Sequence, residues 1–216
     1  MALIVPAILE KTPEAFLATY NKIVGISGLG RVHIDFCDGK FVPHASLSAA
    51  DMPELDRSFH FEAHVMYQKF QDFQRLRDLG FSTIILHAES YEDPQSLREA
   101  LQNISLLGLK SAVALSPETS AERLIEMNTV MGQITALSVH PGQQGSPFIP
   151  EVLDKIKALK HEFPDAILEI DGGMHKDTVA QATASGADLL VVGSDLLTAS
   201  DIQSEFNVLA AIAESS

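Results

Sequence analysis

Short apolar segments rich in β-branched residues recur along the whole chain, and amphipathic stretches separate most of them. We predict that each apolar segment is a strand, because each is short and turn residues bound it. The eight predicted strands are residues 3–9, 31–36, 61–66, 83–88, 110–115, 134–139, 167–171 and 188–193. Helix starts, in which Ser or Thr precedes Pro and Glu, open the intervening stretches "TPEAFLATYNKIV", "SPETSAERLIEM" and "SPFIPEVLDKIKALKHEF".

The alternation of strands with helices predicts a parallel sheet, because a parallel neighbour needs a long crossover connection and a helix is the usual one. Eight such units in 216 residues favour an α/β fold, a single compact TIM (β/α)8 barrel spanning residues 1–216. A doubly wound open sheet is the alternative. No Ser/Gly linker, charge block or short repeat divides the sequence.

Composition and charge narrow the class of protein. With 46% hydrophobic and 20% charged residues, the chain is typical of a globular protein with a substantial core. A formal net charge of -14 argues against nucleic acid and anionic membranes as partners, since both need concentrated Lys and Arg. The single cysteine, Cys37, excludes an internal disulfide and agrees with a reducing compartment. The opening "MALIVPAILEKTP" has no basic leader, so we expect a cytoplasmic protein; the sequence leaves homo-oligomerisation open.

Polar residues alternate along three of the predicted strands. Because alternate side chains of a strand share one face, the polar sets point together into the barrel mouth. These sets are His33, Asp35 and Cys37; Glu62, His64 and Met66; Glu169 and Asp171. A lone inward histidine is more often a hydrogen-bonded core residue, and we interpret His87 in that way. The alternative is that His87 orients a metal ligand or the substrate. Two histidines and two carboxylates together predict one divalent metal ion, with zinc, iron, manganese and cobalt all compatible.

Glycines follow the last three predicted strands, in "HPGQQG" (140–145), "DGG" (171–173) and "VGS" (192–194). Glycine lets backbone N–H groups approach an anion closely, and the loops after the last strands of a TIM barrel often bind phosphate. Each glycine alone is more simply a turn or a helix cap. The three motifs together predict a phosphate site that needs no Lys or Arg.

Five stretches resemble the motifs of the ribulose-phosphate 3-epimerase family, in order and over nearly the whole chain. They are "HIDFCDGKFVPH", "AHVM", "LHAE", "SVHPGQQGSPFIPEVLDKI" and "EIDGGMHKDTVAQATASGADLLVVGS". The resemblance implies a metal-dependent isomerase of the pentose phosphate pathway that inverts C3 of a ketose phosphate. Its expected reaction converts D-ribulose 5-phosphate to D-xylulose 5-phosphate by proton transfer through an enediolate.

The resemblance also implies roles for individual residues. His33, Asp35, His64 and Asp171 would hold the metal, with Asp35 as proton acceptor and Asp171 as proton donor in one direction. The implied substrate and phosphate contacts are His64, Gly142, Gln143, Gln144, Gly145, Gly172, Gly173, Gly193 and Ser194.

The sequence departs from the family's pattern around the expected pocket. The family's "PSIL" reads "PAIL" here, so Ala7 replaces a serine that would face the substrate. The family's cap of methionines corresponds to Cys37, Met66 and Leu137, of which only Met66 is retained. The family's "EPGFGGQ" reads "HPGQQGS", which places His140 beside the phosphate loop. We interpret Ala7, Cys37, Met66 and Leu137 as pocket-lining residues.

Three alternative functions stay open. A six-carbon ketose phosphate such as D-allulose 6-phosphate is one, because the altered pocket leaves room for it. A phosphate-binding decarboxylase of a related barrel is the second. Such an enzyme would need a lysine in a D-x-K-x-x-D pattern, and this chain reads "DFCDG" there, which argues against it. A catalytically silent sugar phosphate binder or assembly subunit is the third, and retention of all four metal-site residues argues against it.

Overall fold

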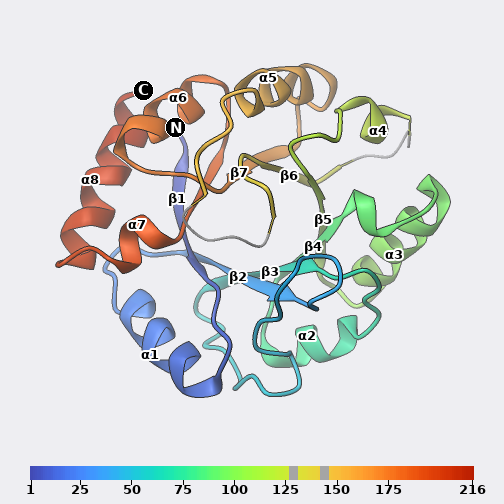
Figure 1. The fold of residues 1–216 in the computed structure, drawn as a ribbon, viewed down its shortest axis with the longest axis horizontal. Coiled ribbons are helices and arrows are strands. Elements are labelled where there is room, and N and C mark those ends of the chain that lie inside the picture. The colour runs from blue at the N-terminus through green and yellow to red at the C-terminus, as the bar shows by residue number, and fades with distance from the viewer. Residues whose placement is uncertain (127–130, 142–145) are drawn as a thin grey trace.

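The computed structural model describes residues 1–126, 131–141 and 146–216. Within them, eight parallel strands close into a barrel in chain order (Figure 1). The strands are β1 (Leu3–Ile8), β2 (Arg31–Cys37), β3 (His60–Met66), β4 (Thr83–His87), β5 (Lys110–Leu115), β6 (Gln133–Leu137), β7 (Ile167–Asp171) and β8 (Leu189–Val192). The predicted TIM barrel is confirmed. The open-sheet alternative is wrong, because β1 pairs with β8 as well as with β2.

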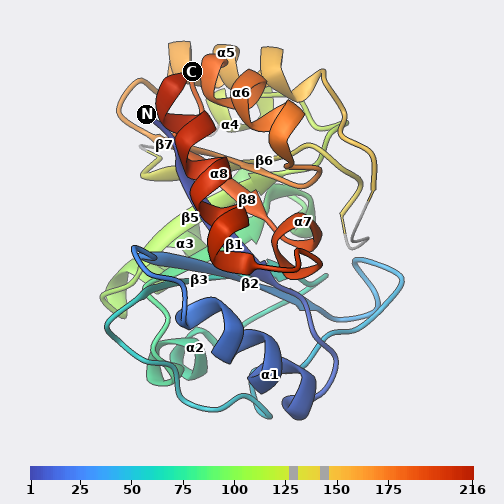
Figure 2. The same ribbon diagram turned by 90° about the vertical axis from the view of Figure 1, so that its left-hand side faces the viewer.

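Helices surround the barrel and cover its outer face (Figures 1 and 2). They are α1 (Pro13–Val24), α2 (Phe73–Leu79), the short 3-10 helix η1 (Ala88–Ser90), α3 (Pro94–Leu106), α4 (Glu122–Ile125), α5 (Val152–Glu162), α6 (Lys176–Ala184), α7 (Ser194–Leu197) and α8 (Ile202–Ser215). No helix in the described part of the chain is long and apolar enough to span a membrane.

Of the three predicted helix starts, only the first contains a side chain that caps its helix. Thr12 Oγ1 accepts the backbone N–H of Ala15 at 3.2 Å and so satisfies one of the free donors at the start of α1. The predictions at the other two stretches are wrong in position. The segment after Ser116 forms a turn before the short helix α4, and α5 begins at Val152, well after Ser146. Neither of these two helices has a side-chain cap.

The two faces of the barrel strands differ in chemistry. On β2, Val32, Ile34 and Phe36 point outward and pack in the main hydrophobic core between strands and helices. The inward residues form a polar layer, in which His33 and Glu62 are fully buried. Strand register then fixes which polar groups meet, since Asp35 lies opposite His64 on β3. The sequence pattern predicted this alternation.

Candidate metal centre and active site

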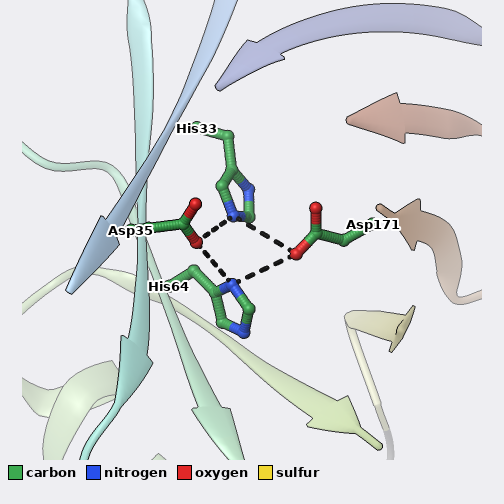
Figure 3. Close-up of side chains that lie close together, drawn as sticks. All are labelled: His33, Asp35, His64 and Asp171. Carbon is green, nitrogen blue, oxygen red and sulfur yellow. Dashed lines mark hydrogen bonds and ion pairs between the residues drawn. The ribbon is translucent and has the colours of Figure 1, made fainter. Parts of the chain in front are cut away.

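Four side chains converge where β2, β3 and β7 end at the barrel mouth. His33 and Asp35 come from β2, His64 from β3 and Asp171 from β7, and one donor atom of each lies within 4.8 Å of all the others. Figure 3 shows the two carboxylates on opposite sides of the two imidazole rings. Asp35 Oδ1 lies 2.9 Å from His64 Nδ1 and 3.3 Å from His33 Nε2. Asp171 Oδ2 lies 3.3 Å and 3.9 Å from the same two nitrogens.

The arrangement fits a bound cation. His33 Nε2 is buried and has no hydrogen-bond partner among the described residues, although two carboxylates lie near it. Asp35 Oδ1, at 3.3 Å, is close enough to attract a positive charge on this ring. A buried nitrogen without a partner is costly unless something binds it. Two imidazoles and two carboxylates are a donor set that divalent transition metals accept.

Burial and neighbouring charges shift the pKa values of His33, Asp35 and His64. Burial lowers the pKa of His33, but Asp35 and Glu62 outweigh it and hold that pKa well above its ordinary value. Burial also lowers the pKa of His64, and Asp171 and Asp35 outweigh it, so the net shift is again upward. Burial raises the pKa of Asp35, but the two histidines hold it well below its usual range. Without a metal, the centre is therefore stabilised as imidazolium–carboxylate pairs, and a metal would replace those protons.

A second polar layer lies beneath the centre, inside the barrel. Glu62 Oε1 accepts from His33 Nδ1 at 2.9 Å, and Glu62 Oε2 pairs with Arg31 at 2.8 Å. Burial raises the pKa of Glu62, but His33 and Arg31 bring it down to about 2. Burial and the Glu62 charge raise the pKa of Glu169, which accepts a hydrogen bond from Thr135 at 2.8 Å. Glu62 thus stays ionised and orients the His33 ring. The sequence placed Glu62 and Glu169 on the inward face but gave them no role.

A pocket opens directly above the centre, and four of the five described residues that were predicted to contact the substrate line it. Its walls include Asp35 and Asp171, the apolar side chains of Ala7, Met66 and Leu137, and the loop residues Gly172, Gly173, Gly193 and Ser194. His64 lies below, fully buried. Cys37 does not line the pocket; it packs with Val42 and Met66 beside it, and burial raises its thiol pKa. Gly142, Gln143, Gln144 and Gly145 lie outside the described residues.

Two pocket glycines are required by the backbone whatever the ligand. Gly172 has a φ of +105°, and a Cβ atom there would overlap the Val139 side chain. Gly173 has a φ of +62°, and its Cβ atom would lie 2.9 Å from Phe148 Cα. Both positions therefore exclude other residues on conformation and space. The presence of glycine at these two positions is therefore explained without a phosphate ligand.

Known proteins match this chain over most of its length. Residues 3–197 match the model of the ribulose-phosphate 3-epimerase family. A ribulose-phosphate 3-epimerase of Oryza sativa subsp. japonica, named a cytoplasmic isoform, is 29% identical over 206 residues, which cover 93% of this chain and 89% of that protein. The ribulose-phosphate 3-epimerase of Chlamydia trachomatis is 31% identical over 192 residues, 85% of this chain and 81% of that protein.

Solved structures support the fold alone. A 3-hexulose-6-phosphate synthase from Salmonella typhimurium superposes with a TM-score of 0.74 at 15% sequence identity, covering 100% of this chain and 99% of that one. A family model that spans nearly the whole chain and relatives of one name settle the assignment. The chain is a member of the ribulose-phosphate 3-epimerase family, and its enzyme class is isomerase.

Proposed function

We propose that this protein inverts C3 of a ketose phosphate, converting D-ribulose 5-phosphate to D-xylulose 5-phosphate with one divalent metal ion. The observation that carries the proposal is the placement of two carboxylates. Asp35 on β2 and Asp171 on β7 flank the same pair of buried imidazoles and both line the pocket above them. Epimerisation needs a base on one face of the substrate carbon and an acid on the other, and the two aspartates supply both.

The four convergent residues would hold the metal, through His33 Nε2, His64 Nδ1 and one oxygen of each aspartate. When bound, a divalent cation would place positive charge beside the substrate's ketone and hydroxyl oxygens and stabilise the negative charge of the enediolate. The two imidazoles are fully buried, whereas the side chains of Asp35 and Asp171 are 13% and 16% exposed. Only the aspartates therefore reach the substrate as well as the centre.

Each aspartate would act as a proton carrier with the oxygen that does not face the histidines. Asp35 Oδ1 and Asp171 Oδ2 face the imidazoles, which leaves Asp35 Oδ2 and Asp171 Oδ1 for the substrate. As a carboxylate, Asp35 can accept a proton from C3. Asp171, which must enter this direction protonated, then gives its proton to the opposite face of C3. The step ends with Asp35 protonated and Asp171 ionised, which is the state from which the reverse reaction starts.

The substrate's phosphate would bind at the pocket wall formed by the loops after β7 and β8. Gly172, Gly173, Gly193 and Ser194 line that wall, and backbone N–H groups can bind an anion in a chain whose formal net charge is -14. The family resemblance implies further phosphate contacts at residues 142–145, which lie outside the described residues. Such anchoring fixes C3 between the two carboxylates.

A six-carbon ketose phosphate is the second candidate substrate. Ala7 lines the pocket where the family's motif has serine, so the wall is smaller by one hydroxyl group. We also propose a cytoplasmic location, which the free thiol of Cys37 and the name of the rice relative support. No nucleic acid or membrane is part of the proposed function.

An epimerisation assay tests the proposal. We expect D-ribulose 5-phosphate to be turned over faster than D-allulose 6-phosphate in the presence of zinc, iron, manganese or cobalt. Free D-ribulose should be worse by on the order of 10³-fold in kcat/KM, because it cannot use the phosphate contacts. Comparable turnover of the free sugar would mean that the glycines are only turns. Absence of turnover with every sugar would make the protein a silent binder.

A further inference from the structure

A line of hydrogen bonds leads from the metal centre into the body of the protein. His64 Nε2, on the side of the ring away from the carboxylates, lies 2.9 Å from His87 Nε2. His87 Nδ1 lies 3.0 Å from Glu89 Oε2. Both histidines are fully buried, and their ring planes differ by only 21°. Phe41 packs on the His87 ring at 4.6 Å between centroids, so these rings are held between other side chains.

At the Glu89 end of this line of hydrogen bonds, the direction of donation is fixed, because Glu89 accepts every bond. Glu89 lies in η1, and its Oε1 accepts the backbone N–H of Ser116 at 2.8 Å. Thr119 also donates to this carboxyl group. A backbone N–H can only donate, and a carboxylate that receives several donors is stabilised in its ionised form. Burial raises the pKa of Glu89, but these donors and His87 bring it down to about 2.

The ionised Glu89 carboxylate determines which ring nitrogen of His87, and then of His64, carries a proton. Because Glu89 accepts, His87 carries its proton on Nδ1, and its Nε2 has a free lone pair. His64 then donates from Nε2, which leaves His64 Nδ1 facing Asp35 and Asp171. The turn that holds Glu89 is itself anchored, since Arg123 donates to the carbonyls of Ala88 at 2.8 Å and Tyr91 at 2.9 Å.

We propose that His87 and Glu89 are positioning residues that keep Nδ1 of His64 available as a metal ligand; this proposal rests on the metal site proposed above. The other imidazole of the centre is oriented directly, by Glu62 on His33 Nδ1 at 2.9 Å. Metal-binding histidines in general donate their second N–H to a carboxylate or a carbonyl, and loss of that partner costs about 10–100-fold in metal affinity. Here His87 lies between the ligand and its carboxylate.

Glu89→Gln is the sharpest test, because it keeps the shape of the side chain and reverses its hydrogen bonding. The Ser116 N–H requires the amide oxygen, so the NH₂ group of the new side chain faces His87 Nδ1. His87 must then carry its proton on Nε2, so His64 Nε2 can no longer donate and the remaining ring proton of His64 lies on Nδ1, where the metal would bind. We expect the metal affinity of the metal-free protein to fall about 10–100-fold, measured by competition with a chromophoric zinc chelator.

Two further measurements separate positioning from a structural effect. In the metal-free proteins, the ¹⁵N NMR signals of the His64 ring should show a proton on Nε2 in the parent, and a proton on Nδ1 but none on Nε2 in the Glu89→Gln variant. At saturating zinc, kcat of the variant should return to within a few-fold of the parent, since neither residue touches the substrate. Glu99→Gln, the same change at an exposed position of α3, should leave both affinity and tautomer unchanged.

His87→Phe is the second variant. It keeps an aromatic ring beside Phe41 and removes the acceptor for His64 Nε2, so zinc affinity should fall here too. A parent protein that binds zinc, with both variants binding within twofold of it, overturns the positioning role and leaves the metal site standing. Reduced affinity of Glu89→Gln with the His64 proton still on Nε2 also overturns it. A parent that binds no metal ion overturns both proposals.

Discussion

Replacement of Asp171 by Asn tests whether this residue carries a proton or only holds the metal. The substitution keeps the size and shape of the side chain and removes its charge. Asp171 Oδ2 lies 3.3 Å from His64 Nδ1, and three of the four convergent residues stay unchanged in the variant. The variant should therefore still bind metal, with reduced affinity, and its kinetics should be measured at saturating metal.

The expected loss follows from the two roles of Asp171. A positioned acid or base contributes typically about 10²–10⁴-fold to the rate. At about 1.36 kcal/mol for each factor of ten, this loss corresponds to about 2.7–5.4 kcal/mol of activation free energy. Asn cannot exchange the proton in either direction, so turnover of D-ribulose 5-phosphate and of D-xylulose 5-phosphate should fall together.

Deuterium exchange in D₂O distinguishes the two aspartates from each other. If Asp35 removes the C3 proton of D-ribulose 5-phosphate, the Asp171→Asn variant should wash deuterium into that substrate without inverting it. The Asp35→Asn variant should neither exchange nor invert D-ribulose 5-phosphate. With D-xylulose 5-phosphate, the Asp35→Asn variant should exchange the C3 proton without inversion, and the Asp171→Asn variant should do neither. NMR integration of the C3 hydrogen measures exchange, and a coupled assay measures inversion. Asp154→Asn, at an exposed position of α5, is the matched control.

An Asp171→Asn variant that binds metal and epimerises within a few-fold of the parent would refute the role of Asp171 as a proton carrier. The residue would then be a metal ligand only. The same result for Asp35→Asn would likewise leave Asp35 as a metal ligand only.

Two other predictions follow from protonation and from packing. The raised pKa values of His33 and His64 mean that metal binding must still displace protons above pH 6.5, where an ordinary histidine is already neutral. Zinc affinity measured by chelator competition should therefore keep rising between about pH 6.5 and pH 8, and a plateau from pH 6.5 would contradict these shifts. Gly172→Ala adds a Cβ atom that overlaps Val139 at a φ of +105°, so the free energy of unfolding in urea should fall by about 2–5 kcal/mol. Val139→Ala in the same chain should recover the packing part of that loss and not the backbone part, and an unchanged urea midpoint for Gly172→Ala would count against the reasoning.

The barrel and its polar mouth were predictable because both depend on local periodicity. The alternation of Val32, Ile34 and Phe36 with His33 and Asp35 sets the two faces of β2 without knowledge of its neighbours. The parallel order then brings strand ends together, which is why convergence with His64 and Asp171 could be expected from sequence.

Features that depend on contacts between distant segments were not predictable. Gly172 is required by Val139, which belongs to another loop, and no local pattern reports that overlap. The contact between His64 and His87 depends on the relative height of β3 and β4. The motif "LHAE" shows His87 and Glu89 two residues apart but does not reveal that η1 turns the Glu89 carboxylate back onto the His87 ring.

Activity of the metal-stripped protein before and after metal is restored is the most direct test of the central claim. The protein should be stripped with a chelator, assayed on D-ribulose 5-phosphate, and titrated with zinc, iron, manganese or cobalt, with bound metal measured by elemental analysis. We predict that turnover to D-xylulose 5-phosphate is lost on stripping and returns as about one metal ion binds per chain, because His33, Asp35, His64 and Asp171 form one four-residue centre. Full turnover by protein that contains no metal, or metal binding at this centre without turnover of any ketose phosphate, would contradict the account.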